Sequence, residues 1–240
     1  MSIEDKNISY EESVMILESM QSLKQLFEKD LPNQYKVLLD ELALAGWYID
    51  YGLALPTLAE LLLLDYHNKT YLDSYLTKYY KTKIKGLSKN IVSSYPTRKN
   101  ILEAAFKAHS NKIYELSIPI MLGQIDGICY DLIEKDLFSK GRRKKNESIP
   151  SNIPQHWVEE LQIDNFRISF LEPLRNNKYL AANFDESREY PHALNRNKIL
   201  HGRDLEYANE KNSYKAISLL NYITTIVTDI KRNDGSMTWI

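Results

Sequence analysis

The sequence is poor in the residues that break chains or cross-link them. Its 240 residues include only 8 glycines, 8 prolines and a single cysteine, Cys129. So few glycines and prolines favour long helices over a turn-rich β fold. One thiol excludes an intramolecular disulfide and a cysteine-based zinc cluster, and it suits a reducing compartment. We therefore expect a cytoplasmic protein.

Neither sign of charge dominates the chain. Lysine and arginine number 31 against 32 aspartates and glutamates, a net charge of −1, so the broad basic field of many nucleic-acid-binding proteins is absent. Any such binding must use a local patch. The N-terminal residues Met1 to Asp5 lack an apolar signal core, and the apolar run around Leu61 to Leu64 is too short to span a bilayer. We expect no membrane association.

Apolar residues recur every three or four positions through most of the chain, which is the period of an amphipathic helix. Alternating strand patterns are lacking, so the sequence predicts an all-α, multi-helix bundle. The last helix carries more than one apolar stripe, which predicts a central position or a place in a subunit interface. The expected helices cover about 10–28, 32–45, 56–65, 68–86, 97–106, 113–133, 156–161, 168–180, 191–200 and 210–230.

Turn and cap residues set the expected boundaries of these helices. Leu31-Pro32 should break the first helix, with Pro32 in the first turn of the second. Asn68 and Thr97 are expected N-caps, because their side-chain oxygens can accept hydrogen bonds from the first free N–H groups. Pro119 should kink the helix over 113–133 by removing one backbone donor.

A break at Ser93-Ser94-Tyr95-Pro96 divides the chain in the predicted organisation. Residues 1–95 form an N-terminal helical region of unknown role, and residues 96–232 form a second helical domain, unless the two are one continuous bundle. Within the second part, 139–156 is expected to be an exposed loop. It contains Arg142, Arg143, Lys144 and Lys145, which suit either contact with an RNA backbone or a solvated surface.

Most catalytic motifs are absent, but Arg196-Asn197-x-x-x-His201 could carry chemistry. Arginine offers a permanently charged, planar fork that suits a phosphate. Histidine titrates near neutrality and can take a proton from a hydroxyl. Together they form a minimal set for attack on an RNA phosphate by its own 2′-hydroxyl, without a metal or cofactor. The five histidines include no pair at the helical spacing of metal ligands, so we expect no metal site.

Helical geometry is the main objection to this motif. Five positions along a helix rotate the side chain by about 140°, so Arg196 and His201 would not share a face. They converge only if the helix ends between them or if two copies meet. Pro191 and Gly202 are expected to open and close this helix. Alternatively, His201 caps a helix C-terminus and Arg196 forms a surface ion pair.

The sequence around the motif resembles bacterial HEPN-type proteins, over roughly residues 97–230. The resemblance is carried by LNRNKILHG at 194–202, NSYKAISLL at 212–220, YELSIP at 114–119 and QIDGI at 124–128. Members of this superfamily are helical bundles that often dimerise, and many are metal-independent ribonucleases with an Arg-x(4–6)-His motif. The resemblance implies that His201 is the general base or acid, Arg196 holds the scissile phosphate and Asn197 orients the site.

Two functions are therefore expected. The first is an RNA endonuclease of toxin, abortive-infection or phage-defence type, a homodimer with RNA as substrate and possibly an antitoxin or defence-system protein as partner. Lys198 and Arg203 flank the motif and would add phosphate contacts, as would Arg142 to Lys145. The alternative is a non-catalytic module that uses the same cleft to bind RNA, a nucleotide or a protein. A purely structural subunit is a third possibility.

Overall fold

Every regular element in the described part of the chain is a helix. The computed structural model describes residues 10–50, 60–63, 67–138, 153–176 and 179–233. The all-α prediction is confirmed for these residues. The longer helices are α1 (Tyr10–Gln25), α2 (Leu31–Leu44), α4 (Lys69–Ser94), α5 (Lys99–Ser110), α6 (Tyr114–Ile133) and α11 (Glu210–Tyr222).

Shorter elements join and extend these helices. Two turns of π-helix and two of 3-10 helix occur beside α-helices of four to eight residues. They are η1 (Leu26–Asp30), η2 (Pro96–Arg98), α7 (Ile153–Glu160), α8 (Asn165–Phe170), α9 (Glu172–Arg175), η3 (Glu186–Glu189), α10 (Arg196–Leu200), η4 (Ile223–Val227) and α12 (Thr228–Asn233).

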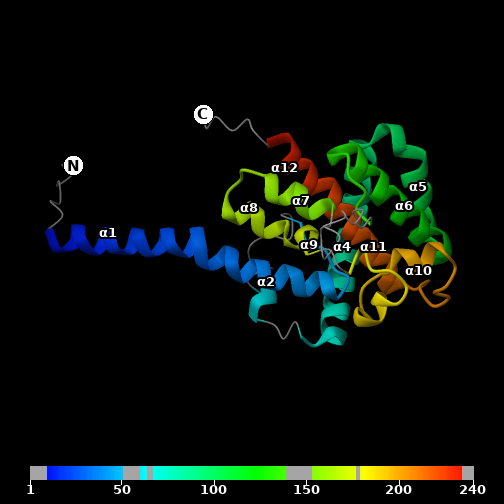
Figure 1. The fold of residues 1–240 in the computed structure, drawn as a ribbon, viewed down its shortest axis with the longest axis horizontal. Helices are drawn as coiled ribbons and strands as arrows, with labels where there is room; N and C mark the ends of the chain where they lie inside the picture. Colours follow the sequence, from blue (N-terminus) through cyan, green and yellow to red (C-terminus); the bar gives the residue numbers. More distant parts are fainter. Residues whose placement is uncertain (1–9, 51–59, 64–66, 139–152, 177–178, 234–240) are drawn as a thin grey trace, which may run out of the picture.

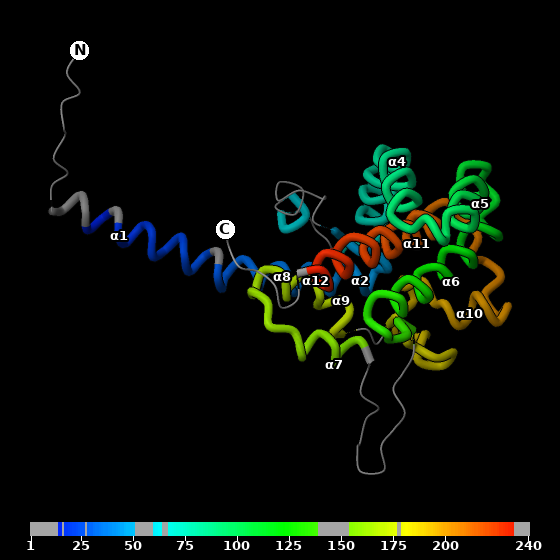
Figure 2. Tube along the Cα trace, turned by 90° about the horizontal axis from the view of Figure 1, so that it is seen from above, coloured from blue at the N-terminus to red at the C-terminus, as the bar shows by residue number. Residues whose placement is uncertain are grey.

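Helix α11 lies at the centre of the molecule, between α4 and α6 (Figures 1 and 2). Every residue from Ser213 to Tyr222 is buried. The π turn η4 continues it into α12, so the predicted last helix is present and its central position is confirmed. One cluster of buried apolar residues extends from Tyr35 to Ile230, and it therefore includes side chains from both halves of the chain.

Helix α6 fills the space beside α11 with apolar side chains. Ile118, Met121 and Ile125 are fully buried, and α6 packs against both α5 and α11. Its length and hydropathy would also suit a membrane span, but a buried core helix meets the same criteria. Burial raises the pKa of the Cys129 thiol on this helix to about 12, which keeps the thiol protonated and unreactive.

The expected break at Leu31-Pro32 is wrong. Helix α1 passes through the π turn η1 directly into α2, and the Leu31 N–H donates to the Leu26 carbonyl. A π turn is wider than an α turn, so it accommodates a proline ring that has no N–H to donate. The result is a long N-terminal helical arm that projects from the body of the molecule (Figures 1 and 2).

Two helix boundaries around α4 and α5 differ from the predicted ones because of tertiary contacts. Helix α4 has the predicted Asn68 cap, whose side chain accepts from the Tyr71 N–H at 3.1 Å, but it continues past Gly86 to Ser94 because Ile91 is buried. Thr97 is not an N-cap. It lies inside η2, and Arg98 takes the cap position of α5. Arg98 forms an ion pair of 2.6 Å with a carboxylate on α6, and this contact holds η2 in place.

Prolines account for two further corrections. Of the loop expected over 139–156, residues 139–152 lie outside the described part of the chain, and the remainder is wrong, because α7 begins at Ile153 and buries Pro154 in its first turn. The helix expected over 168–180 is two short helices, since Pro173 starts the new helix α9.

Pro119 lies inside α6, and the helix runs through it. Of the helix expected over 56–65, residues 60–63 are described and helical.

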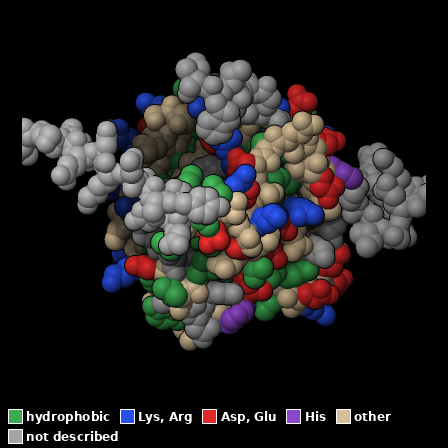
Figure 3. Space-filling view, turned by 90° about the vertical axis from the view of Figure 1, so that its left-hand side faces the viewer, with side chains coloured by type: hydrophobic (Ala, Val, Ile, Leu, Met, Phe, Trp, Pro, Cys, Tyr) green, Lys and Arg blue, Asp and Glu red, His purple; other side chains and the backbone are tan. Residues whose placement is uncertain are grey.

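Charged side chains of both signs are interspersed on the surface. The face shown in Figure 3 mixes basic and acidic groups with scattered apolar ones. This pattern agrees with the net charge of −1.

Candidate functional site

The motif occupies α10, a helix of only five residues. Asn195 is its N-cap: the side-chain oxygen accepts from the Lys198 N–H at 2.8 Å, and the amide donates to the Ala182 carbonyl at 3.0 Å. Gly202 follows with a φ of +64°, the left-handed conformation expected after a helix end. Pro191 does not open this helix as expected, because the extended backbone of Asn195 ends the preceding turn and starts the helix.

The Arg196 side chain points toward α6. One terminal nitrogen lies 3.6 Å from Asp126 Oδ2, another donates to Asn197 Oδ1 at 3.3 Å, and the guanidinium carbon lies 5.6 Å from the centre of the Phe138 ring. Its Nε is buried and has no hydrogen-bond partner among the described residues. The contacts of the terminal nitrogens are long, so these nitrogens retain N–H donors for a phosphate, whereas the buried Nε is not accessible to one.

Asp126 joins this arginine to the end of α6. Its Oδ1 accepts from the Leu137 N–H at 3.0 Å while Oδ2 faces Arg196. Burial raises the pKa of the Asp126 carboxyl, and the charge of Arg196 and the backbone donors oppose that rise. The carboxylate therefore positions Arg196 relative to the turn that carries Phe138.

The Asn197 side chain forms a hydrogen bond with the backbone of a distant segment. Its amide donates to the Ala182 carbonyl at 3.0 Å, the same oxygen that accepts from Asn195. The residue expected to orient the site thus fastens α10 to the segment around Ala182.

His201 lies at the other end of α10, in the C-cap position, and is exposed. Its N–H still donates to the Asn197 carbonyl at 3.1 Å, so the helix does not end between Arg196 and His201. Among the described residues, neither a hydrogen bond nor an ion pair joins these two side chains. The non-catalytic interpretation of the motif predicted a histidine at a helix C-terminus and an arginine in an ion pair. Both are also present in the structure.

Two further cations surround an exposed ring next to the motif. Lys198 Nζ lies 5.4 Å and the Arg203 guanidinium carbon 5.1 Å from the centre of the Phe184 ring. Within the described residues neither cation forms an ion pair with a carboxylate. Phe184 is 37 % exposed. Sequence reasoning missed it, because it lies outside α10 and no local spacing links it to the motif.

The other residues considered from the sequence lie apart from this cluster. Arg142, Arg143, Lys144 and Lys145 are outside the described residues. His109 is buried as expected, with Nδ1 2.7 Å from Ser213 Oγ. Although this pair has the elements of a nucleophile and its base, Ser213 is fully buried, so a substrate cannot reach it.

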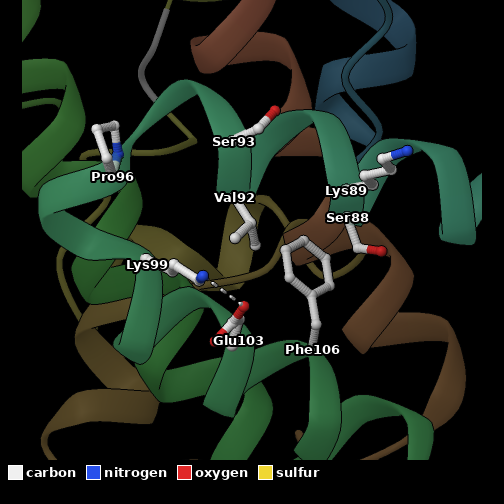
Figure 4. A pocket seen from close by; sticks show the side chains of 8 residues that line it. All are labelled: Ser88, Lys89, Val92, Ser93, Pro96, Lys99, Glu103 and Phe106. Atoms are coloured by element: carbon white, nitrogen blue, oxygen red, sulfur yellow. Dashed lines mark ion pairs between the residues drawn. The ribbon is translucent and has the colours of Figure 1, made fainter.

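A cavity of about 440 Å³ lies between α4 and α5 (Figure 4). Val92 and Phe106 point into it, and Lys99 lies 3.9 Å from Glu103 at its edge. It is lined by Ser88, Lys89, Val92, Ser93, Pro96, Lys99, Glu103 and Phe106. The motif residues take no part in this lining, so the cavity is separate from the candidate site.

Comparisons with protein-family models, with curated proteins and with solved structures find no match for this chain. The resemblance to HEPN-type proteins therefore stays a prediction from the residues that carry it.

Proposed function

We propose that this protein is a metal-independent RNA endonuclease with its active site around α10. The observation that carries the proposal is a concentration of basic groups, Arg196, Lys198, His201 and Arg203, on one short helix and the turn after it. In a chain of net charge −1, such a local patch is what RNA binding requires. The resemblance around residues 194–202 supports the same reading.

The chemistry assigned to each residue follows from its environment. Arg196 binds a phosphate of the RNA backbone with the donors left free by its long contact to Asp126. His201 accepts the proton of the adjacent 2′-hydroxyl. The 2′-oxygen forms a bond to phosphorus, the bond to the 5′-oxygen breaks, and that oxygen takes up a proton from an imidazolium or from water. The products are a 2′,3′-cyclic phosphate and a 5′-hydroxyl.

The separation of Arg196 from His201 bears on how the site is completed. Because five residue positions separate them along α10 and its C-cap, their side chains diverge by about 140°. We propose that the site lies in a cleft shared by two copies, so that the arginine of one copy and the histidine of the other act on one phosphate. A cytoplasmic role in a toxin or phage-defence system, with an antitoxin or defence protein as partner, is the setting that the resemblance suggests.

The alternative is a module that binds RNA, a nucleotide or a protein without cleaving it. The divergence of Arg196 and His201 favours this reading, because no hydrogen bond joins the two side chains among the described residues and a single copy does not bring both catalytic groups together.

Replacement of His201 tests the proposal directly. We expect the wild-type protein to cleave total RNA or tRNA in the presence of EDTA, and His201→Ala to lose at least about a hundredfold of that rate, the usual effect of removing a general base. Circular dichroism should show the same helix content, because His201 is exposed. RNA fragments should end in a cyclic phosphate.

The matched control is His156→Ala, which removes another exposed histidine, on α7. It should cleave like the wild type. Binding of RNA without cleavage by any of the three proteins would support the binding module instead. Equal cleavage by wild type and His201→Ala would overturn the assignment of His201.

A further inference from the structure

The exposed ring of Phe184 is carried by a turn whose backbone is tightly fixed. Asn183 Oδ1 accepts from the N–H groups of Asp185 and Glu186, each at 3.0 Å. Glu186 Oε2 in return accepts from the Asn183 N–H at 3.0 Å, the reciprocal arrangement of a capping box. The Phe184 carbonyl also accepts from the hydroxyl of the buried residue Ser187 at 2.7 Å. The turn therefore holds the ring in one place without burying it.

The same segment is fastened to the motif. The Ala182 carbonyl, two residues before the ring, accepts from the amides of Asn195 and Asn197 at 3.0 Å each. Two cations from α10 and the turn after it, Lys198 and Arg203, lie 5.4 Å and 5.1 Å from the centre of the ring. Two segments of the chain therefore build one surface from a ring and two cations.

These contacts leave both the ring and the cations able to bind a ligand. Phe184 keeps 37 % of its surface exposed, so the cations do not cover the ring. Within the described part of the chain, neither Lys198 nor Arg203 forms an ion pair with a carboxylate. An exposed ring beside two such cations suits a ligand that is both flat and anionic, which is the chemistry of a nucleotide.

The acidic side chains next to this surface in the sequence have other partners. Asp185 lies 3.8 Å from a terminal nitrogen of Arg188. Asp204 Oδ1 accepts from the Glu206 N–H at 3.0 Å. The two cations beside the ring therefore remain available for phosphates.

We propose that Phe184 stacks against an unpaired base of the RNA, while Lys198 and Arg203 bind the phosphates beside that base. The inference rests on the proposed function, since it assumes that RNA is what the α10 site binds, and it makes the substrate single-stranded. Proteins commonly hold single strands by stacking bases on aromatic rings and placing cations along the backbone. Every base has a π face, so this contact adds affinity without selecting a sequence.

A double helix does not fit this surface in the same way. Within a duplex both faces of each base are covered by the neighbouring base pairs, so an exposed ring meets the backbone instead of a base. The cations can bind the phosphates of either form. Stacking on Phe184 therefore predicts a preference for single strands that is lost when the ring is removed.

Fluorescence anisotropy with two labelled 2′-O-methyl RNA probes tests the stacking. One probe is a single strand and the other is the same strand paired with its complement, and neither can be cleaved. We expect the wild type to bind the single strand more tightly. Phe184→Leu keeps an apolar side chain but has no π face, so it should weaken binding of the single strand about tenfold or more and affect the duplex much less. Phe184→Trp should restore the wild-type affinity.

Two controls separate stacking from other effects. Tyr71→Leu removes another exposed ring, on α4, and should leave both affinities unchanged. Lys198→Gln combined with Arg203→Gln should weaken binding of both probes, because both carry phosphates. Circular dichroism should show the same helix content in all variants.

Equal affinity of the wild type and Phe184→Leu for the single strand would overturn the inference. So would a wild type that binds the two probes equally, or binds neither. Cleavage is measured separately, so the two proposals fail in different ways. If His201-dependent cleavage is found and Phe184→Leu binds like the wild type, only the stacking is wrong. If the single strand binds through Phe184 and is never cleaved, only the ribonuclease step is wrong.

Discussion

The side-chain amine of Lys215 is buried in the core, where the two halves of the chain meet. It is 2 % exposed. Its Nζ donates to the His192 carbonyl at 3.0 Å and lies 3.1 Å from Asp73 Oδ1. Asp73 also accepts from the Trp47 indole at 2.8 Å and pairs with Lys211 at 3.0 Å. This network ties the turn before the motif to α4 and α11, so its charge state bears on the whole site.

Burial lowers the pKa of Lys215 to about 8 from its ordinary 10.5, and the attraction of Asp73 only partly opposes the change. Between these values the unfolded chain holds a proton that the folded chain has lost, so stability rises with pH. From pH 7 to 9.5 we expect the free energy of unfolding of the wild type to rise by about 2 kcal/mol relative to Lys215→Met. Urea denaturation of both proteins over this pH range measures the free energy of unfolding.

Tyrosines that titrate in the same range are common to both proteins and cancel in this difference. A constant difference between wild type and Lys215→Met across the pH range would contradict the prediction. It would mean that Lys215 stays charged in the folded protein up to the pH at which it titrates in the unfolded chain.

At the scale of the element, α10 is too short to be stable on its own. Five residues make little more than one turn, so the helix depends on what fastens it. The Ala182 carbonyl accepts from the amides of both Asn195 and Asn197, each at 3.0 Å. Ile199 is buried beneath the helix. The position of Arg196 and His201 is therefore set by one cap and one backbone oxygen.

Asn195→Ala should destabilise the protein by about 1–3 kcal/mol, because it removes the N-cap and one of the two donors to a buried carbonyl. RNA cleavage should fall with it. Asn68→Ala is the matched control, since it removes the exposed N-cap of α4. That change should cost about 1 kcal/mol and leave cleavage unchanged. Urea denaturation and the cleavage assay, run on both variants, make the comparison. Equal loss of activity in the two variants would argue against a local role for the cap.

At the scale of the whole molecule, nucleic-acid binding must come from few cations. Positive and negative charges nearly balance over the chain, and the face in Figure 3 mixes both signs. The described candidates for phosphate contact are Arg196, Lys198 and Arg203, and the sequence adds Arg142 to Lys145. The number of these cations that meet RNA sets the salt dependence of binding.

If all seven contact single-stranded RNA, log K should fall with log salt with a slope of about −5, since each contact contributes about −0.7. Replacement of Arg142, Arg143, Lys144 and Lys145 by serine should reduce the slope to about −2. A 2′-O-methyl RNA, which cannot be cleaved, allows binding to be measured by fluorescence anisotropy at several salt concentrations. An unchanged slope after the four replacements would remove the basic run from the RNA-binding surface.

Local sequence patterns determined a large part of the fold. Apolar periodicity over 113–133 and 210–230 predicted α6 and the continuous helix α11–α12 to within a few residues. Asn68 and Gly202 predicted a helix start and a helix end, because capping and the left-handed conformation depend on the residue itself. Local patterns predicted helix ends at Gly86 and at Leu31-Pro32 that the structure does not have. Core burial outweighed the local preference at Gly86, and a widened turn did so at Leu31-Pro32.

The sequence by itself determined the helical class, the presence of a broadly apolar last helix and the residue types of the motif. Only the tertiary structure decided that Arg196 turns toward Asp126 on α6, that Phe184 joins Lys198 and Arg203, and that α1 packs, within the described residues, mainly on its own continuation η1. The physical reason is that helical period depends on neighbours three or four residues apart. Side-chain direction on a short helix, and the contacts between distant segments, depend instead on which surfaces are buried together.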